Sequence, residues 1–267
     1  MKSIYSEILE LAEGGSSGVL VTVIAKEGSG PAATGTKMIV YSDGKISGTV
    51  GGGTIEKMAI EKALTLFETK KNAQEKYNMN EPGQGTDTGM ICGGAATLFF
   101  EYFAPKKYVY IYGAGHIGRA LAYHLKQLNY HITLIDDRQD VLETNRDADE
   151  KIHAPFAEAL NDKVVEKEAF FVIATYQHKY DSVVLNKIFG SDWQAKYVGM
   201  VSSRKKKKQM TRALLELYPQ ANLDILYTPA GLNIGGTLPH EIAIAIISEM
   251  QAVANAKNVK HLRDGHD

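Results

Sequence analysis

The chain contains a single cysteine, Cys92, among its 267 residues. One cysteine cannot form a disulfide within the chain, so a reducing, cytoplasmic setting is expected. It also excludes the usual iron–sulfur clusters, which need about four thiolate ligands. No pair of residues has the spacing of a zinc site, and the sequence has neither a Gly-x-Ser-x-Gly elbow nor a P-loop Lys-Ser/Thr. Hydrolase and NTPase functions are therefore disfavoured.

An excess of one charge and long apolar runs are absent as well. The formal net charge is −1, so the broad basic excess of a general nucleic-acid binder is missing. No apolar run approaches the roughly 18 uncharged residues that a membrane span requires. Glu7, Glu10 and Glu13 interrupt the apolar residues near the start, a pattern that predicts a helix and not a signal peptide. We expect a soluble protein without nucleic-acid or membrane partners.

The order of predicted elements changes at about residue 104. Before it, strands separated by glycine turns surround one long helix over 54–70. After it, short apolar strands alternate with helices, which is the pattern of a parallel sheet. The predicted strands of this second part are 108–113, 131–137, 151–154, 168–175 and 195–202, and its predicted helices are 116–129, 181–190, 208–218 and 239–256. We predict two domains, an α+β domain over 1–104 and a larger α/β domain over 105–267.

The first strand of the second domain runs directly into the motif Gly113-Ala-Gly115-His116-Ile-Gly118 and then into a helix. In the Rossmann fold, such glycines permit a tight turn, let a pyrophosphate approach the backbone and let helix and strand pack closely. Unpaired N–H groups at the helix start, beside His116, favour an anion. Asp136 follows about 20 residues later, where an acid that binds ribose is expected. The second domain is therefore predicted to be Rossmann-like. NAD(P) is a candidate ligand, and a packing role for the glycines is the alternative.

Cys92 lies between glycines, in the loop Thr86-Asp-Thr-Gly-Met-Ile-Cys92-Gly93-Gly94, and not among the apolar residues that surround a core cysteine. Backbone N–H groups of Gly93 and Gly94 could stabilise a thiolate, which is a better nucleophile and metal ligand than a thiol. The simpler interpretation makes Cys92 a small residue at the start of the strand 96–103.

The triple glycine Gly51-Gly52-Gly53 precedes the helix 54–70, with Thr54 as its expected N-cap. Loops of this kind suit anions, although an ordinary strand-to-helix turn explains the glycines equally well. Together with the cysteine loop and the glycine-rich segment 27–35, they suggest a binding surface on the first domain.

Further candidates follow the strands of the predicted parallel sheet at their carboxyl ends, where ligands bind in open α/β folds. Arg204 and Lys205 could contact a phosphate, and a solvated helix face is the alternative. His178, followed by Asp181, could act as an acid, a base or a metal ligand. The simpler interpretation is a surface histidine without a functional role. Thr237 is expected to cap the last helix.

The order of these motifs resembles the XdhC/CoxI family from about Gly18 to Ala252. The matching segments are EGSGPAATGTKM, GTVGGGTIEKM, DTGMICGGAATLFFE, VYIYGAGHIGRAL, ATYQHKYD, YVGMVSSRKK and TPAGLNIGGTLPHEIAIAIISEM. The Gly-Met-x-Cys-Gly-Gly element and the closing Gly-Leu-x-Ile-Gly…Pro-x-Glu-Ile-Ala element are the most specific parts.

The resemblance implies a maturation factor for molybdenum hydroxylases such as xanthine dehydrogenase, not the hydroxylase itself and most simply not an enzyme. Such factors bind the molybdenum–pterin cofactor, as molybdopterin or its dinucleotide form. They protect it while a cysteine desulfurase helps to install its sulfido ligand, and they deliver it to the target enzyme. The implied partners are the molybdenum subunit and the desulfurase, and the last apolar helix could supply a homodimer face.

The resemblance also implies roles for the candidate residues. Cys92 would be the catalytic residue and the metal ligand, since thiolate is a soft ligand. The residues expected to bind the cofactor are Gly51, Gly52, Gly53, Gly93, Gly94, Gly113, Gly115, His116, Gly118, Asp136, Arg204 and Lys205.

Two positions depart from the family pattern. Ala32 follows Pro31 where the family commonly has arginine, which removes a guanidinium suited to phosphate or carboxylate. Thr54 follows the triple glycine where the family often has a cysteine, so a two-cysteine sulfur relay within one chain is excluded. An NAD(P)-dependent oxidoreductase, with Asp136 on the ribose and His178 as acid or base, is the alternative function. A scaffold that only recruits partners is the third.

Overall fold

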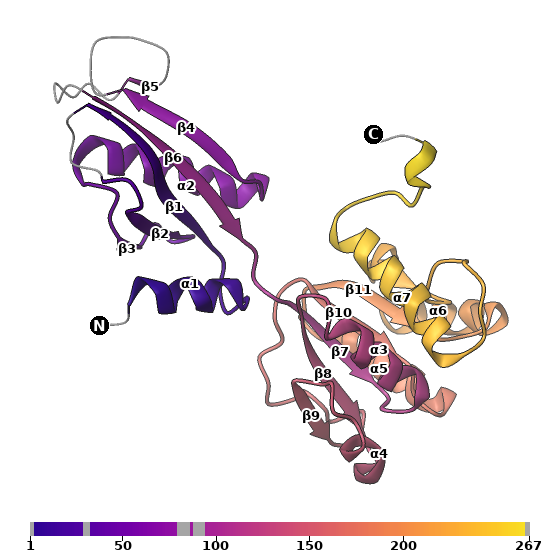
Figure 1. Cartoon of the computed structure of the whole chain (residues 1–267). Coiled ribbons are helices and arrows are strands. Elements are labelled where there is room, and N and C mark those ends of the chain that lie inside the picture. Colours follow the sequence, from indigo (N-terminus) through magenta and orange to yellow (C-terminus); the bar gives the residue numbers. More distant parts are fainter. Residues whose placement is uncertain (1–2, 29–32, 79–85, 88–93, 265–267) are drawn as a thin grey trace. The chain divides into compact units, whose positions relative to one another are not determined.

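The structure is a computed structural model (Figure 1), which describes residues 3–28, 33–78, 86–87 and 94–264. The chain folds into two compact units, Met1–Lys106 and Lys107–Asp267. Each unit contains its own sheet and its own apolar core. None of the helices in these described ranges is long and apolar enough to cross a lipid bilayer.

The first unit is an α+β fold with strand order β3-β2-β1-β6-β4-β5. Its strands are antiparallel neighbours except for the parallel pair β4 and β5. The elements are α1 (Ile4–Ala12), β1 (Gly18–Gly28), β2 (Lys37–Tyr41), β3 (Ile46–Gly48), α2 (Gly53–Thr69), β4 (Ala73–Asn78), β5 (Thr86–Asp87) and β6 (Gly94–Phe103).

Alternation along β1 explains why both faces of this sheet carry a helix. Successive side chains of a strand point to opposite faces. Val19 and Val21 therefore join the core formed with α2, whereas Leu20 packs with Leu11 of α1. The turn between β2 and β3 is closed by the Gly44 N–H, which donates to the Tyr41 carbonyl at 2.9 Å.

The second unit is a parallel sheet with strand order β12-β11-β10-β7-β8-β9. All of its neighbouring strands are parallel, which confirms the predicted Rossmann-like fold. The elements are β7 (Lys107–Tyr112), α3 (His116–Leu125), β8 (Tyr130–Asp136), α4 (Gln139–Glu143), β9 (Glu150–His153), β10 (Ala169–Ile173), α5 (His178–Gly190), β11 (Ala195–Met200), α6 (Arg204–Leu217), the 3₁₀ turn η1 (Leu223–Ile225), β12 (Leu226–Tyr227), α7 (Pro239–Ala254) and the 3₁₀ turn η2 (Leu262–Asp264).

The second sheet is covered on both faces. Val109 and Ile111 of β7 pack into the core formed with α3 and α7, whereas Tyr110 and Tyr112 pack into the core formed with α5 and α6. From β7 the chain first adds strands in one direction and then, from β10 on, in the other. The boundary between β7 and β10 is therefore the topological switch point, where ligands bind in open α/β sheets.

The expected helix starts are corrected at several places. Helix α5 begins at His178 and α6 at Arg204, earlier than predicted, because their first turns are polar and lack the apolar period. The expected caps Thr54 and Thr237 are wrong, since the N-caps are Gly52 and Leu238. In both helices a first-turn glutamate supplies the acceptor instead. Oε2 of Glu56 accepts the Gly52 N–H at 3.2 Å, and Oε2 of Glu241 accepts the Leu238 N–H at 2.9 Å.

The only tryptophan of the chain allows the stability of the second unit to be measured separately. Trp193 stacks on Phe171, with ring centroids 5.5 Å apart, and Phe171 is fully buried. Phe171→Ala should lower the free energy of unfolding of this unit by about 3–5 kcal/mol, because it leaves a cavity. The measurement is denaturant unfolding followed by Trp193 fluorescence. Phe100→Ala, in the core of the first unit, should leave this transition in place. If Phe100→Ala moved it as far as Phe171→Ala does, the two units would unfold together.

Candidate functional site

The glycine motif after β7 packs against the loop after β10, at the switch point. A Cβ atom added to Gly113 would lie 2.2 Å from the Ala174 carbonyl oxygen, and the φ of Gly113 is +112°. A Cβ atom added to Gly118 would lie 1.9 Å from the Gly113 carbonyl oxygen. Only glycine fits such close approaches. These two glycines therefore hold the turn, β7 and α3 together.

Gly115 differs from both, because nothing lies within 4 Å of an added Cβ atom. It is the N-cap of α3 and provides no side chain to receive the first N–H groups of that helix. His116, the first residue of α3, is exposed at the same turn. The open position at Gly115 leaves room for an anion beside the first N–H groups of α3.

Asp136, at the end of β8, is fully buried and has four hydrogen-bond donors. Its Oδ2 accepts the Ala114 N–H at 2.7 Å and Arg138 Nη2 at 2.9 Å. Its Oδ1 accepts the Arg138 N–H at 3.0 Å and Arg138 Nε at 2.9 Å. Burial by itself would raise the pKa of Asp136, but the hydrogen bonds from Arg138 and Ala114 outweigh it and hold this pKa below its usual range.

A second contact joins the loop after β8 to the loop after β10. The Arg138 guanidinium lies 4.0 Å from the centre of the Tyr176 ring. The Tyr176 hydroxyl donates to Oδ2 of Asp137 at 3.0 Å. Because β8 and β10 flank β7, these contacts connect the loops on either side of the glycine motif. The sequence analysis singled out neither Arg138 nor Tyr176. The one signal in the sequence was that an arginine stands two residues after Asp136.

At the ends of β10 and β11 the structure gathers the predicted His178 and Asp181 with two further side chains. The Thr175 hydroxyl donates to Asp181 Oδ1 at 2.5 Å, and His178 Nδ1 lies 3.4 Å from Asp181 Oδ2. Lys206 Nζ lies 3.1 Å from His178 Nδ1. Asp181 is buried, and this burial raises its pKa above the usual value despite the hydrogen bonds from Thr175 and His178. This cluster combines an imidazole with a lysine amine and a buried carboxyl.

The loop after β12 forms a cavity of about 370 Å³. A half-buried acid of α7, Glu249, fixes the loop by accepting the Gly231 N–H at 2.9 Å and the buried Tyr197 hydroxyl at 2.7 Å. The residues that line the cavity include Pro229, Gly231, Asn233, Gly235, Gly236 and Ile242. Since β12 belongs to the parallel sheet, the cavity lies beyond its carboxyl edge.

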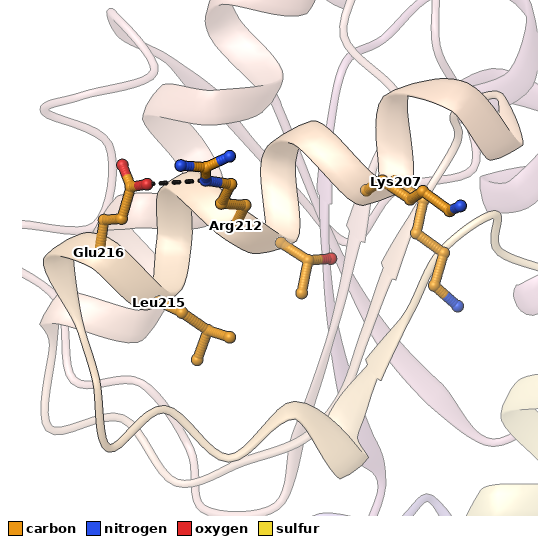
Figure 2. Close-up of a pocket in the computed structure, with 6 residues that line it drawn as sticks. Lys207, Arg212, Leu215 and Glu216 are labelled. Atoms are coloured by element: carbon orange, nitrogen blue, oxygen red, sulfur yellow. Dashed lines mark hydrogen bonds and ion pairs between the residues drawn. The ribbon is translucent and has the colours of Figure 1, made fainter.

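A pocket of about 520 Å³ on α6 is a different kind of feature. Figure 2 shows its lining, with Arg212 paired to Glu216 at 3.0 Å. All lining residues come from this one helix: Lys207, Lys208, Thr211, Arg212, Leu215 and Glu216. It is a hollow beside an exposed helix and does not bring separate elements together, so we assign it no ligand.

In the first unit, the triple glycine already holds an anion, which is the carboxylate of Glu56. Oε2 of Glu56 accepts the Val50 and Gly52 N–H groups, each at 3.2 Å, and the Thr49 hydroxyl. The Gly51 N–H donates to the Thr49 hydroxyl oxygen at 3.1 Å. This loop is therefore closed by its own helix.

Some predicted site residues lie beyond what the structure describes. Cys92 and Gly93 fall outside the described residues, and Gly94 begins β6. The backbone of Arg204 and Lys205 forms the start of α6, and their side chains are not described. Within the described ranges, no group of three or more His, Cys, Asp or Glu residues could hold a metal ion.

Comparison with known proteins identifies two matching family models. The XdhC Rossmann domain matches residues 109–250, and the XdhC and CoxI family matches residues 11–78. The first match covers the carboxyl ends of β7, β8, β10 and β11 described above.

Three curated relatives match the chain over different lengths. YqeB of Escherichia coli is 29% identical over 257 residues, which cover 95% of this chain and 46% of YqeB. A probable xanthine dehydrogenase subunit of Bacillus subtilis is 25% identical over 57% of this chain and 44% of its own length. The molybdenum cofactor insertion chaperone PaoD of Escherichia coli is 30% identical over 36% of this chain and 30% of PaoD. The chain thus spans less than half the length of each of these relatives.

A crystal structure described as a xanthine dehydrogenase from Bacillus halodurans shares the fold. Its TM-score is 0.52, and the match covers 96% of this chain and 97% of that one at 20% identity. At this identity the likeness supports the fold alone.

Two glycines of the motif, Gly118 and Gly115, should respond differently to an added methyl group. Gly118→Ala should lower the free energy of unfolding by about 1–3 kcal/mol, because its Cβ would overlap the Gly113 carbonyl oxygen. Gly115→Ala should change stability by no more than about 0.5 kcal/mol, since its Cβ meets nothing. Thermal and denaturant unfolding of both variants would test this. Equal destabilisation would show that the space beside Gly115 is filled.

The ion pair of Asp136 should make stability depend on pH in a defined window. The pKa of Asp136 in the folded chain lies below its ordinary value of 3.8, so its stabilisation is present above this pH and is lost as the pH falls through the lower folded-state value. Asp136→Asn should lower the free energy of unfolding by about 3 kcal/mol at pH 7, because it breaks a buried pair. This difference from the wild type should begin to narrow below about pH 4 and narrow further as the pH falls toward the folded-state pKa of Asp136. Asp43→Asn, which removes an exposed pair with Lys45, is the control and should change stability little. A gap that stayed constant down to pH 3 would contradict the assignment.

Proposed function

Because the chain belongs to the XdhC/CoxI family, we propose that it is an accessory factor for a molybdenum hydroxylase. In this proposal it binds the molybdenum–pterin cofactor and assists its sulfuration and its insertion into a xanthine dehydrogenase-type enzyme. Two relatives support it by their names, a molybdenum cofactor insertion chaperone and a probable xanthine dehydrogenase subunit. The observation that carries it is the open space at Gly115, the N-cap of α3, inside the domain that matches the family.

The residues of the second unit fit the phosphate-bearing part of such a cofactor. Gly115 leaves open space in front of the first N–H groups of α3, and a phosphate there would also complement the helix dipole. Arg204 and Lys205 begin α6 just beyond β11, at the same edge of the sheet. The cavity beyond β12 offers about 370 Å³ at that edge. We assign the phosphate end to the motif Gly113–Gly118 and its neighbours.

The role of Cys92 rests on its chemistry and on the family resemblance. When bound, the cofactor would supply a molybdenum centre, and a thiolate is a soft ligand suited to such a metal or to carrying sulfur. Because the chain has no second cysteine, any relay of sulfur must involve a partner such as a cysteine desulfurase. A cytoplasmic setting and a homodimer belong to the same proposal.

The proposal predicts that the purified protein retains cofactor and that Cys92 is needed for this. The chain would be produced in a host that makes the molybdenum cofactor, and molybdenum and pterin would be measured per mole of protein. Cys92→Ala should lower the retained molybdenum at least about tenfold, which corresponds to a loss of about 1.4 kcal/mol of binding energy. Gly115→Ala should lower the retained pterin, because its methyl group occupies the space for the phosphate.

Two controls make the result interpretable. Glu216→Gln, on the exposed face of α6, should retain as much cofactor as the wild type. Unfolding curves should show that Cys92→Ala remains folded. Equal retention by the wild type and Cys92→Ala would remove the role of Cys92, and a wild type without any cofactor would contradict the proposed function.

A further inference from the structure

The ribose end of the Rossmann cleft differs here from a site built for an unmodified ribose. In such sites the acid at the end of the second strand accepts the ribose hydroxyl groups. That strand is β8, and the acid is Asp136. A carboxylate has about four acceptor positions, and Asp136 uses four of them, on Ala114 and Arg138. Its side chain is 0% exposed, so no position is left for a ribose hydroxyl.

The next residue, Asp137, does not replace it. Its Oδ2 accepts the Tyr176 hydroxyl at 3.0 Å, and its Oδ1 is buried without a hydrogen-bond partner among the described residues. The carboxylate is thus turned into the loop against Tyr176. Its charge disfavours an anion nearby, which makes it a useful position for a test.

Arg138, in contrast, has side-chain N–H donors that Asp136 does not use. A guanidinium carries five N–H donors, and Asp136 takes two of those of Arg138, one from Nε and one from Nη2. Three remain without an acceptor in the part of the chain that the structure describes. The Arg138 side chain is 34% exposed.

Two contacts hold this guanidinium in a fixed orientation. Asp136 binds it in a two-pronged arrangement from one side, and the Tyr176 ring lies 4.0 Å from it. A guanidinium that is already ordered loses less entropy when it binds a ligand. Planar, paired donors of this kind match the oxygens of a phosphate group.

We propose that this end of the cleft takes a nucleotide whose ribose carries a phosphate, as in NADPH, in preference to one with a free ribose diol. Arg138 binds the ribose phosphate, Asp136 positions Arg138, and the turn beside Gly115 receives the pyrophosphate. This ligand and the phosphate end of the molybdenum cofactor are both assigned to the turn beside Gly115, so the two would bind there alternately. The preference for a ribose phosphate rests on Arg138 and does not depend on cofactor retention through Cys92.

The ribose phosphate can be tested separately with small probes. Isothermal calorimetry would compare adenosine 2′,5′-bisphosphate with 5′-AMP, and NADPH with NADH. The phosphorylated member of each pair should bind about 10- to 100-fold more tightly, the effect expected of charge-assisted hydrogen bonds from one arginine. Raised salt should weaken the preference, because Arg138 is partly exposed.

Three variants distinguish the role of Arg138 from a general effect of charge. Arg138→Lys keeps the charge but loses the planar fork, so the preference should shrink severalfold. Because this change also disturbs Asp136, its unfolding curve is measured in parallel. Asp137→Asn leaves the Asp136–Arg138 pair intact and removes the opposing charge, so it should increase the preference. Tyr176→Phe keeps the ring beneath the guanidinium and should retain the preference.

Four results would overturn this inference. They are equal affinity for the bisphosphate and 5′-AMP, tighter binding of NADH than NADPH, no binding of any of the four probes, or no increase with Asp137→Asn. Each of them would leave the measured retention of molybdenum unaffected, so this failure and that of the proposed function can be distinguished.

Discussion

The carboxylate of Asp136 lies buried at the end of β8 and is bound from two loops at once. The Ala114 N–H reaches it from the glycine motif, and Arg138 reaches it from the loop that follows β8 itself. Through the Tyr176 ring, Arg138 extends the connection to the loop after β10. The loops at the ends of β7, β8 and β10 are therefore connected by one network of hydrogen bonds and ring stacking. A buried charge with this many donors is strongly held, because leaving any donor or acceptor unpaired in the interior is costly.

The geometry of the switch point depends on this network around Asp136. Gly113 and Gly118 let the backbone pass at distances that no side chain would permit, and the Ala114 N–H between them is fixed by Asp136. The same arrangement leaves open space where a side chain on Gly115 would lie. The edge of the sheet thus presents an open backbone turn for an anion next to an ordered arginine. These are the features on which the proposed ligands depend.

At the carboxyl ends of β10, β11 and β12, other acidic side chains hold the loops. Asp181 orients Thr175 and His178, and Glu249 fixes the loop that encloses the cavity. In the first unit, Glu56 fills the glycine loop at the start of α2. In each place a carboxylate from a helix receives backbone N–H or hydroxyl groups of a neighbouring loop. The loop before α2 and the loop after β12 are consequently each held by a carboxylate from a helix outside the loop.

The Rossmann-like part of the fold could be predicted because its signals are local. Alternating strands and helices, the spacing of Gly113, Gly115 and Gly118, and the position of Asp136 are all readable within a few tens of residues. Weaker elements were missed. The polar strand β4 is held mainly by its pairing with β6, and the first turn of α6 is charged throughout. Neither has the apolar period from which a helix or strand is recognised.

The class of the second domain and the resemblance to the XdhC/CoxI family followed from the order of amino acids alone, since both rest on short motifs whose residues are close together in the chain. Which polar groups remain available to a ligand depended instead on the folded chain. Asp136, the expected ribose acid, is saturated by Arg138 and Ala114, and Lys206 meets His178 across two helices. Hydrogen-bond partners of this kind come from separate strands and loops. These groups pair with one another because the sheet brings the carboxyl ends of its strands together. A local sequence pattern does not contain this information.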